Sequence, residues 1–402
     1  MWIAVAVWAV LAFRLMIADV WDETNGMLFF SDLAIPLSAK LHVALTQSLG
    51  FWRPLPTLIA ALFLHFIPSF AVSWRVLRFV NMLMIGGALL LLADAAERWR
   101  ERSERRRFLF TIALLFSGSG VMAAGWYAEI FDATALLLIA LGLARLARGR
   151  DVEAGVLFGI AFYAKETAVL ALPFLVILLA AGRISFRSAL RAAIPAVILG
   201  GIYFAIRSRI VPFGSASDVH GFVKSEFLPT LVNVCATFWI QTMKRRMLII
   251  GLAFLALSLA ALRKPRTIAV TALFLIGCAV IYWGMFLEYQ DGALITHLNF
   301  IGRLYLVPAA LFLVLLMVEA RDAAIAVLLI PILFGGVETY RDHTRFQRVY
   351  KRIYRTAAES KTKPLVVHFP PKPLADKVRG LDVGDHPDAK VLIDPAKGLT
   401  FR

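Results

Sequence analysis

The chain has 402 residues, of which 60% are hydrophobic and 17% charged, and its formal net charge is +16. Soluble globular domains are about half apolar and a quarter charged, so this composition excludes a water-soluble globular enzyme. Apolar runs of about 15–20 residues recur along most of the length, which predicts an all-α polytopic membrane protein. The positive charge is expected in cytoplasmic loops beside anionic head groups, so it indicates membrane lipids and not nucleic acid as partner.

The first apolar run, "MWIAVAVWAVLAFRLMI" (1–17), is interrupted by one arginine. No basic stretch precedes it and no small-x-small cleavage site follows it, so we predict a retained signal-anchor helix. It leads into "ADVWDETNGML" (18–28), where Asp19, Asp22 and Glu23 bring three carboxylates to the outer membrane boundary. A helix end in water accounts for Asp19. The adjacent pair Asp22 and Glu23 has no basic neighbour in sequence and indicates a functional loop.

Residues 20–75 form the first outer loop, which is too long for a simple turn and too apolar for a soluble loop. Within it, "LAIPLSAKLHVALTQSL" (33–49) repeats leucine every four residues, and "LPTLIAALFLHFIPSF" (55–70) is short for a span. We predict that both are helices in the outer interface. The alternative is that 55–70 crosses the membrane, which would place the basic cluster 98–107 outside, against the positive-inside rule.

Basic clusters set the predicted topology. Those expected in the cytoplasm are "RWRERSERRR" (98–107), "ARLARGR" (144–150), "GRISFRSALR" (182–191) and "LRKPR" (262–266). The apolar segments between them are roughly 1–19, 76–96, 108–125, 131–147, 152–165, 166–182, 188–206, 246–262, 267–287, 301–318 and 323–337. They predict about eleven transmembrane helices, with the N-terminus inside and the C-terminus outside.

One apolar stretch requires a break. As a single helix, residues 154–182 would span about 43 Å, against a hydrocarbon core of about 30 Å. We therefore predict two short helices that meet near the outer face, with "AKET" (164–167) at the join.

The C-terminal part changes character. "YRDHTRFQRVYKRIYR" (340–355) is basic and carries an apolar stripe, which predicts an amphipathic interfacial helix. The polar remainder contains "PLVVHF" and "AKVLI" as candidate strands of a small two- or three-stranded appendage. The predicted division is a transmembrane catalytic module, 1–338, followed by an amphipathic helix and a small extramembrane segment, 339–402.

Ionisable residues at membrane depth are costly and usually functional. In the predicted topology they converge on the outer boundary from at least five segments. The set comprises Asp19, Asp22, Glu23, Glu129, Asp132, Lys165, Glu166, Arg207, Arg209, Asp218, His220, Arg303 and Tyr305. These residues also have structural explanations. Lys165 and Glu166 could form an ion pair, Asp132 could cap the N-terminus of its helix, and Arg303 could anchor its helix at the interface.

A boundary pocket with carboxylates and several cations suits sugar transfer from a lipid phosphate. The cations would hold the phosphate and stabilise the charge that develops on it as it leaves. A carboxylate would take the proton from an acceptor hydroxyl as that hydroxyl attacks the sugar carbon. The same carboxylates, Asp22, Glu23 and Asp132, are also the oxygen ligands that a hard divalent cation prefers.

The motif order resembles that of the GT-C glycosyltransferases and is most similar to the protein O-mannosyltransferase and lipid A aminoarabinose-transferase branch. The resemblance covers roughly 1–340. It rests on "DVWDETNG", "FWRPLPTLIAALF", "RVLRFVNMLMIGGALLLL", "GWYAEIFDATALLLIALGLA", "AGVLFGIAFYAKETAVLALPFLVILL" and "FIGRLYLVPAAL" in this order. It implies a GT-C-like helical bundle and a polyprenyl-phosphate sugar as donor.

The resemblance also implies roles for individual residues. The family's catalytic base corresponds to Asp22, with Glu23 beside it, and its second outer-face aspartate corresponds to Asp132. The resemblance places Lys165 and Arg303 near the donor phosphate, and we add Tyr305 and Arg53 as further candidates for phosphate binding. Secondary candidates are Glu129, Glu166, Arg207 and His220. The resemblance implies catalysis without a metal or other cofactor.

The chain departs from protein-glycosylating members of the family, because the loop after the predicted seventh helix is short and lacks their large soluble domains. We therefore expect a lipid or glycan acceptor, an inverting transfer, and an active site on the outside of a bacterial inner membrane. The rival functions are a transporter or flippase for lipid-linked sugars, a polymerase or ligase with a diphosphate donor, and a structural assembly subunit.

Overall fold

The computed structural model describes only part of the chain, and every structural statement below concerns that part. The described residues are 2–14, 35–46, 52–66, 70–100, 103–118, 120–121, 130–210, 227–228, 231, 245–262, 264–285, 306–359, 365–368, 390–394 and 398–401. Apart from three short strands near the C-terminus, the regular elements are helices.

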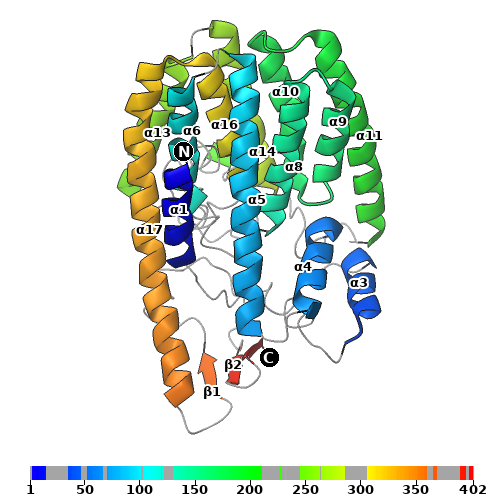
Figure 1. The fold of residues 1–402 in the computed structure, drawn as a ribbon, viewed down its shortest axis with the longest axis vertical. Helices are drawn as coiled ribbons and strands as arrows, with labels where there is room; N and C mark the ends of the chain where they lie inside the picture. Colours follow the sequence, from blue (N-terminus) through cyan, green and yellow to red (C-terminus); the bar gives the residue numbers. More distant parts are fainter. Residues whose placement is uncertain are drawn as a thin grey trace.

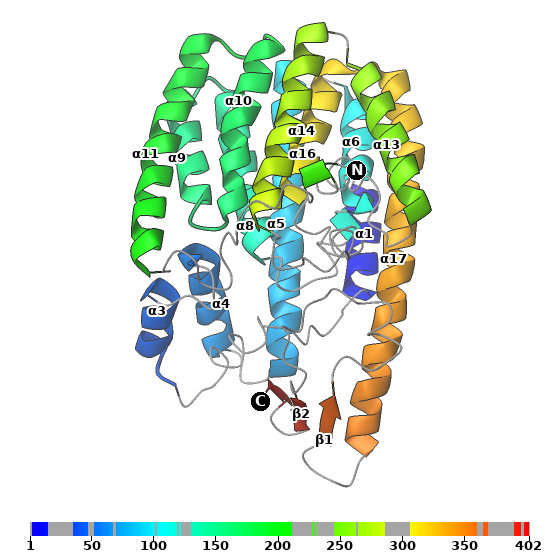
Figure 2. The same ribbon diagram turned by 180° about the vertical axis from the view of Figure 1, so that it is seen from behind.

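Long helices lie side by side along the long axis of the molecule (Figures 1 and 2). The three described helices that are long and apolar enough to cross a membrane are Phe79–Trp99 in α5 (Phe70–Trp99), Phe186–Ile210, which is α11, and Ala323–Arg341 in α17 (Asp322–Glu359). The remaining helices are α1 (Trp2–Arg14), α3 (Leu37–Thr46), α4 (Pro54–Phe66), α6 (Glu104–Leu115), α8 (Ile130–Leu146), α9 (Asp151–Ala161), the 3-10 helix η2 (Glu166–Leu170), α10 (Ala171–Ala180), α13 (Arg245–Ala260), α14 (Pro265–Met285) and α16 (Leu306–Glu319). The long apolar helices support a membrane location, whereas the number of crossings, the compartment and the orientation stay predictions.

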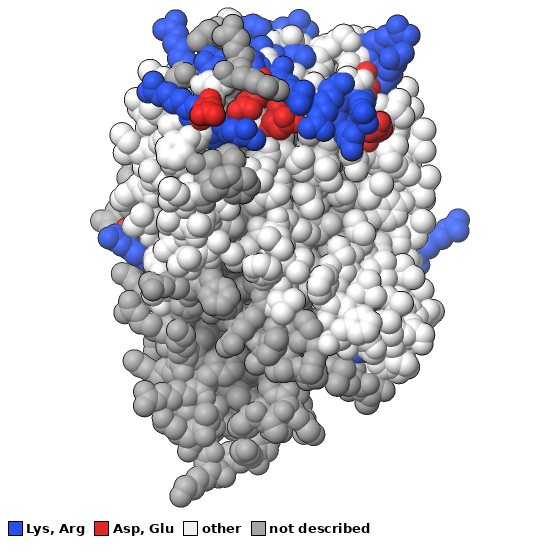
Figure 3. Space-filling model, viewed as in Figure 1, with Lys and Arg blue, Asp and Glu red and all other residues white. Residues whose placement is uncertain are grey.

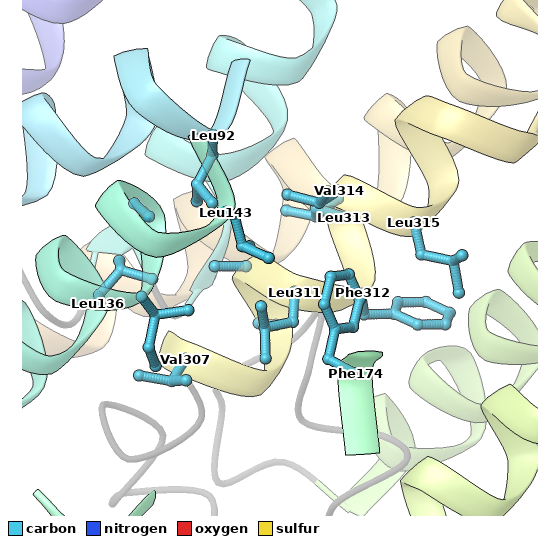
Figure 4. Close-up of a cluster of buried hydrophobic side chains, with 14 of the residues drawn as sticks. Leu92, Leu136, Leu143, Phe174, Val307, Leu311, Phe312, Leu313, Val314 and Leu315 are labelled. Carbon is cyan, nitrogen blue, oxygen red and sulfur yellow. The ribbon is translucent and has the colours of Figure 1, made fainter. Parts of the chain in front are cut away.

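The core is centred on α16, because every one of its side chains is buried. A helix that is apolar on all faces belongs in the interior of a bundle. Figure 4 shows its side chains, among them Leu311 and Phe312, beside Leu136 of α8 and Phe174 of α10. The segment that precedes α16 contains Arg303 and Tyr305, which lie outside the described residues.

On the face seen in Figure 3, basic side chains gather at one end of the molecule, above a broad band where they are scarce. The predicted cytoplasmic clusters meet there: Arg148 Nη2 lies 2.7 Å from Asp94 Oδ2, Arg183 Nη1 donates to the Trp99 carbonyl at 2.9 Å, and Lys264 Nζ donates to the Ala181 carbonyl at 2.6 Å. We call this end the basic rim, formed by the described basic residues of 98–107, 144–150, 182–191 and 264–266. We use the name far end for the level, away from the basic rim, at which α9 and α11 end; α3 and α4 lie beyond it (Figures 1 and 2).

The length of α11 matches a bilayer. Exposed Arg191 lies near its rim end and exposed Arg209 near its far end. The helix between them is about 27 Å long, close to a hydrocarbon core of about 30 Å. Its outward face carries exposed apolar side chains, including Ile194 and Ile198. The basic rim and the far end are therefore placed as the two surfaces of a membrane-spanning bundle would be.

The predicted break in 154–182 is confirmed. The chain leaves α9 at Ala161, turns through 162–164, is extended at Lys165 with φ −164° and ψ 143°, and enters η2 and then α10. Because α9 begins at the basic rim and α10 returns to it, the join lies at the far end. The "AKET" residues therefore stand where two short helices meet.

Close packing of α9 against α11 fixes what lies beside this join. A Cβ on Gly155 would come 2.2 Å from the carbonyl oxygen of Ala192, and a Cβ on Gly159 would come 2.5 Å from the Cβ of Leu199. Glycine at both positions lets the two helices approach closely. The last turns of α11 consequently lie next to 162–166.

The two helices predicted in the first outer loop exist as α3 and α4. They pack on each other, and Figures 1 and 2 place them beyond the far-end termini of α9 and α11. Lys40 Nζ, on α3, lies 3.2 Å from Nδ1 of His65, on α4. At 13 residues, α4 measures about 20 Å, which is shorter than the hydrocarbon core.

The C-terminal prediction requires one correction. The span predicted at 323–337 and the amphipathic helix predicted at 340–355 are parts of the single helix α17, which runs through the predicted division at 338/339. The sequence "VETY" at 337–340 contains no glycine or proline to end the helix, so the change from apolar to basic residues occurs within it. Pro331 is also accommodated inside α17.

The appendage is an antiparallel sheet of β1 (Leu365–His368), β2 (Lys390–Asp394) and β3 (Gly398–Phe401), in that order. Leu365 pairs with Ile393, and Val391 pairs with Phe401. β1 and β2 coincide with the two segments predicted as strands; a third strand was within the prediction, but its position, β3, was not predicted.

The predicted sidedness is testable by cysteine labelling, in a background where Cys235 and Cys278 are replaced by alanine. Exposed Ser38 on α3 is expected to react with an impermeant maleimide added outside, as is residue Ser360, which lies outside the described residues. Ser103, the N-cap of α6 at the basic rim, is expected to react only after the membrane is permeabilised. Outside labelling at Ser103 would reverse the orientation.

Candidate functional site

A buried ion pair joins α8 to the join between α9 and α10. Asp132 lies in the first turn of α8, where a carboxylate suits the positive end of the helix. Lys165 Nζ donates to Asp132 Oδ2, and both side chains are almost fully buried. Asp132 Oδ1 has no hydrogen-bond partner among the described residues. One oxygen of this buried carboxylate therefore has no hydrogen-bond donor among the described residues.

The next residue, Glu166, binds two arginines from separate parts of the chain. Arg53 Nε and Nη2 lie 3.1 Å and 3.0 Å from Glu166 Oε2. Arg207 Nε lies 3.5 Å from Oε1, and the Tyr203 hydroxyl donates to Oε1 at 2.9 Å. Glu166 thus connects α11 to the segment that precedes α4.

An aromatic frame supports these contacts. Trp52 stacks on Tyr203 with ring centroids 5.3 Å apart and an interplanar angle of 20°. Tyr163 packs edge-on against Tyr203, also at 5.3 Å. The Tyr203 hydroxyl lies 2.9 Å from the Trp52 carbonyl oxygen, and Leu55 N donates to the Tyr163 carbonyl at 3.2 Å. Residues 52–55 therefore connect the α3–α4 pair both to α11 and to the α9–α10 join.

The two ion pairs form one group, which we call the far-end cluster: Arg53, Asp132, Lys165, Glu166, Tyr203 and Arg207. The Arg53 guanidinium lies 5.2 Å from the ring centroid of Phe131, beside Asp132. Burial by itself would lower the pKa of Arg53, but the charge and hydrogen bond of Glu166, together with Tyr203 and Asp132, raise the pKa above its ordinary value. With three cations and two carboxylates, the cluster carries a net charge of +1 and attracts an anion.

Five of the predicted site residues, from four separate segments, are brought together in this cluster: Arg53, Asp132, Lys165, Glu166 and Arg207. The other predicted site residues lie outside the described part of the chain: Asp22, Glu23, Glu129, His220, Arg303 and Tyr305. No group of three or more His, Cys, Asp or Glu side chains suited to a metal ion occurs within the described residues.

Sequence reasoning missed Tyr203 and Trp52. A signal for Tyr203 exists, because it precedes Arg207 by four residues and so shares its face of α11. In an otherwise apolar helix, a buried phenol needs a hydrogen-bond partner, and Glu166 and the Trp52 carbonyl oxygen supply acceptors. Trp52 is adjacent to Arg53 in sequence, but it contributes by packing against Tyr163 and Tyr203.

None of the family models, curated proteins or solved structures compared with the chain matches it.

Proposed function

We propose that the protein is a membrane glycosyltransferase. It transfers a sugar from a polyprenyl-phosphate donor to a hydroxyl of a lipid or glycan acceptor, with inversion, on the outer side of a bacterial inner membrane. The observation that supports this most strongly is the far-end cluster. Three residues predicted from sequence as donor-phosphate or catalytic groups, Arg53, Asp132 and Lys165, meet there with two secondary candidates, Glu166 and Arg207.

The proposed architecture is a GT-C-like bundle of about eleven spans, in which the far end faces the periplasm. The basic rim supports this orientation, because short cytoplasmic loops carry the excess of Lys and Arg. A polyprenyl chain would lie in the bilayer and place its phosphate at the level of the head groups. The far-end cluster lies where the helices α8 and α10 begin and α9 and α11 end, which suits a phosphate at that level.

In the proposed reaction, Asp22 accepts the proton of the acceptor hydroxyl as the oxygen attacks the anomeric carbon of the sugar. The bond from that carbon to the phosphate oxygen breaks, and polyprenyl phosphate leaves with its electron pair. Lys165 and Arg303, with Arg53 and Tyr305, stabilise the charge that develops on the phosphate. Asp132 holds Lys165 in place.

Loss of donor affinity tests the proposal. Charge-assisted hydrogen bonds to phosphate are worth about 1.5–3 kcal/mol, so Lys165→Ala and Arg303→Ala should each weaken donor binding roughly ten- to a hundredfold. The measurement is binding of a polyprenyl-phosphate sugar to the full chain in lipid nanodiscs, with thermal unfolding recorded for each variant.

Arg209→Ala is the matched control, because it removes an exposed charge near the end of α11 without touching the cluster. It should bind donor as the parent does. If both Lys165→Ala and Arg303→Ala remain folded and bind donor with the parent affinity, these residues do not contact the phosphate.

A further inference from the structure

Glu166 occupies a place that would suit a bound phosphate. Its two oxygens are surrounded by the guanidinium of Arg53, the guanidinium of Arg207 and the hydroxyl of Tyr203, at 2.9–3.5 Å. Two guanidinium groups and a hydroxyl are a donor set that proteins use for phosphate, because arginine matches the geometry of anionic oxygens. In this structure the anion is supplied by the chain itself.

We infer that Arg53, Arg207 and Tyr203 form a phosphate-binding site which Glu166 fills, as an internal competing anion, when no ligand is bound. The ligand is the phosphate ester of a lipid. The inference rests on the proposed function only in taking that lipid to be a polyprenyl phosphate.

The electrostatics of the site support competition. With Glu166 in place, the two arginines and the carboxylate sum to a charge of +1, and displacement of Glu166 exposes a charge of +2 to the incoming anion. The side chains of Glu166 and Arg207 keep 16% and 14% of their surface exposed, against 8% for Arg53, although Arg207 Nε itself is buried. Arg207 is therefore the more exposed of the two arginines that would receive a phosphate.

The backbone at Glu166 is suited to a small movement. Glu166 is the first residue of the 3-10 helix η2, and its neighbour Lys165 is extended. Short 3-10 segments have poorer hydrogen-bond geometry than α-helices, so their first residue is held less tightly. A rotation of the Glu166 side chain would leave Lys165 paired with Asp132.

The decisive variant is Glu166→Gln, which keeps the shape of the side chain and removes its charge. We expect undecaprenyl phosphate to bind about tenfold more tightly, because one competing charge is removed at contact distance from both arginines. We also expect the unliganded variant to melt at a lower temperature than the parent, because Arg53 loses its counter-ion. Saturation with undecaprenyl phosphate should then restore stability, and by more than it does in the parent.

Two kinds of control distinguish a local effect at this site from a general effect of the protein's net charge. Glu153→Gln removes an exposed carboxylate at the basic rim and should leave affinity unchanged. Arg207→Gln should weaken binding of undecaprenyl phosphate about tenfold or more. Combined with Glu166→Gln, it should abolish the tighter binding that Glu166→Gln produces alone. Arg209→Gln should have neither effect. All variants are measured as the full chain in phosphatidylcholine nanodiscs.

Three probes distinguish the source of the phosphate. If inorganic phosphate also binds more tightly to Glu166→Gln, the site recognises phosphate alone, and if only undecaprenyl phosphate does, the polyprenyl chain contributes; both results support the inference. If only phosphatidylglycerol responds, the ligand is a membrane phospholipid and the polyprenyl assignment is overturned. If Glu166→Gln binds every probe as the parent does, or more weakly and without phosphate-dependent rescue, Glu166 is a structural counter-ion. None of these outcomes depends on sugar transfer, so failure here and failure of the proposed reaction are distinguishable.

Discussion

Replacing Asp22 with asparagine is expected to lower the rate of sugar transfer at saturating donor by about a hundredfold or more. General-base catalysis contributes typically 10²–10⁴-fold, and an amide cannot accept the proton. Because the substitution leaves the donor phosphate contacts intact, donor affinity should stay at the parent value. The measurement is the turnover of a polyprenyl-phosphate sugar by the reconstituted protein.

Glu23→Gln is the matched control for the base. If the first helix continues through them, these adjacent residues point about 100° apart, and only one of the pair can be directed at the sugar. Glu23→Gln should therefore lose much less activity than Asp22→Asn. If Asp22→Asn keeps near-parent turnover while Glu23→Gln or Asp132→Asn is inactive, the base has to be reassigned.

Replacing Lys165 with methionine is expected to destabilise the protein by about 3–5 kcal/mol, because it leaves the Asp132 carboxylate buried without its counter-ion. Asp132 Oδ1 already lacks a partner among the described residues, so no second donor is in place to compensate. The measurement is the free energy of unfolding in detergent micelles.

A second substitution separates the ion pair from packing. In the double variant Lys165→Met with Asp132→Leu, both charges are removed and most of the lost stability should return, while donor binding stays weak. Equal destabilisation in the single and double variants would mean that the loss comes from side-chain packing. Full recovery of donor binding would mean that the pair serves structure alone.

Most of the arrangement of the far end follows from simple physical limits on the sequence. A stretch at 154–182 longer than a bilayer had to break at its only charged residues, and it does so at Lys165 and Glu166. Basic clusters far apart in sequence had to share one side, and they do, through contacts such as Arg183 with the Trp99 carbonyl. The positions of Asp132 and Arg207 at the far end follow from the direction of α8 and α11.

Partner choice among these charges was not predictable. The sequence places Lys165 beside Glu166 and suggests that they pair, but in the structure Lys165 binds Asp132 and Glu166 binds Arg53. Neighbouring residues at a turn point in different directions, so adjacency in sequence does not determine pairing. The continuity of α17 was not predictable either. A change from apolar to basic residues resembles a helix boundary in sequence, even where no residue ends the helix.

The central claim is that a sugar leaves a polyprenyl phosphate at the far end, and conversion of the donor tests it most directly. Vesicles containing the full chain, a polyprenyl-phosphate hexose and an extract of envelope lipids and glycans would be analysed by mass spectrometry. The account predicts that donor is consumed, polyprenyl phosphate appears, and the hexose is found on an acceptor with inverted anomeric configuration, with the parent protein but not with Asp22→Asn. Recovery of the donor intact in the opposite leaflet, with no polyprenyl phosphate formed, would contradict the account and identify a transporter.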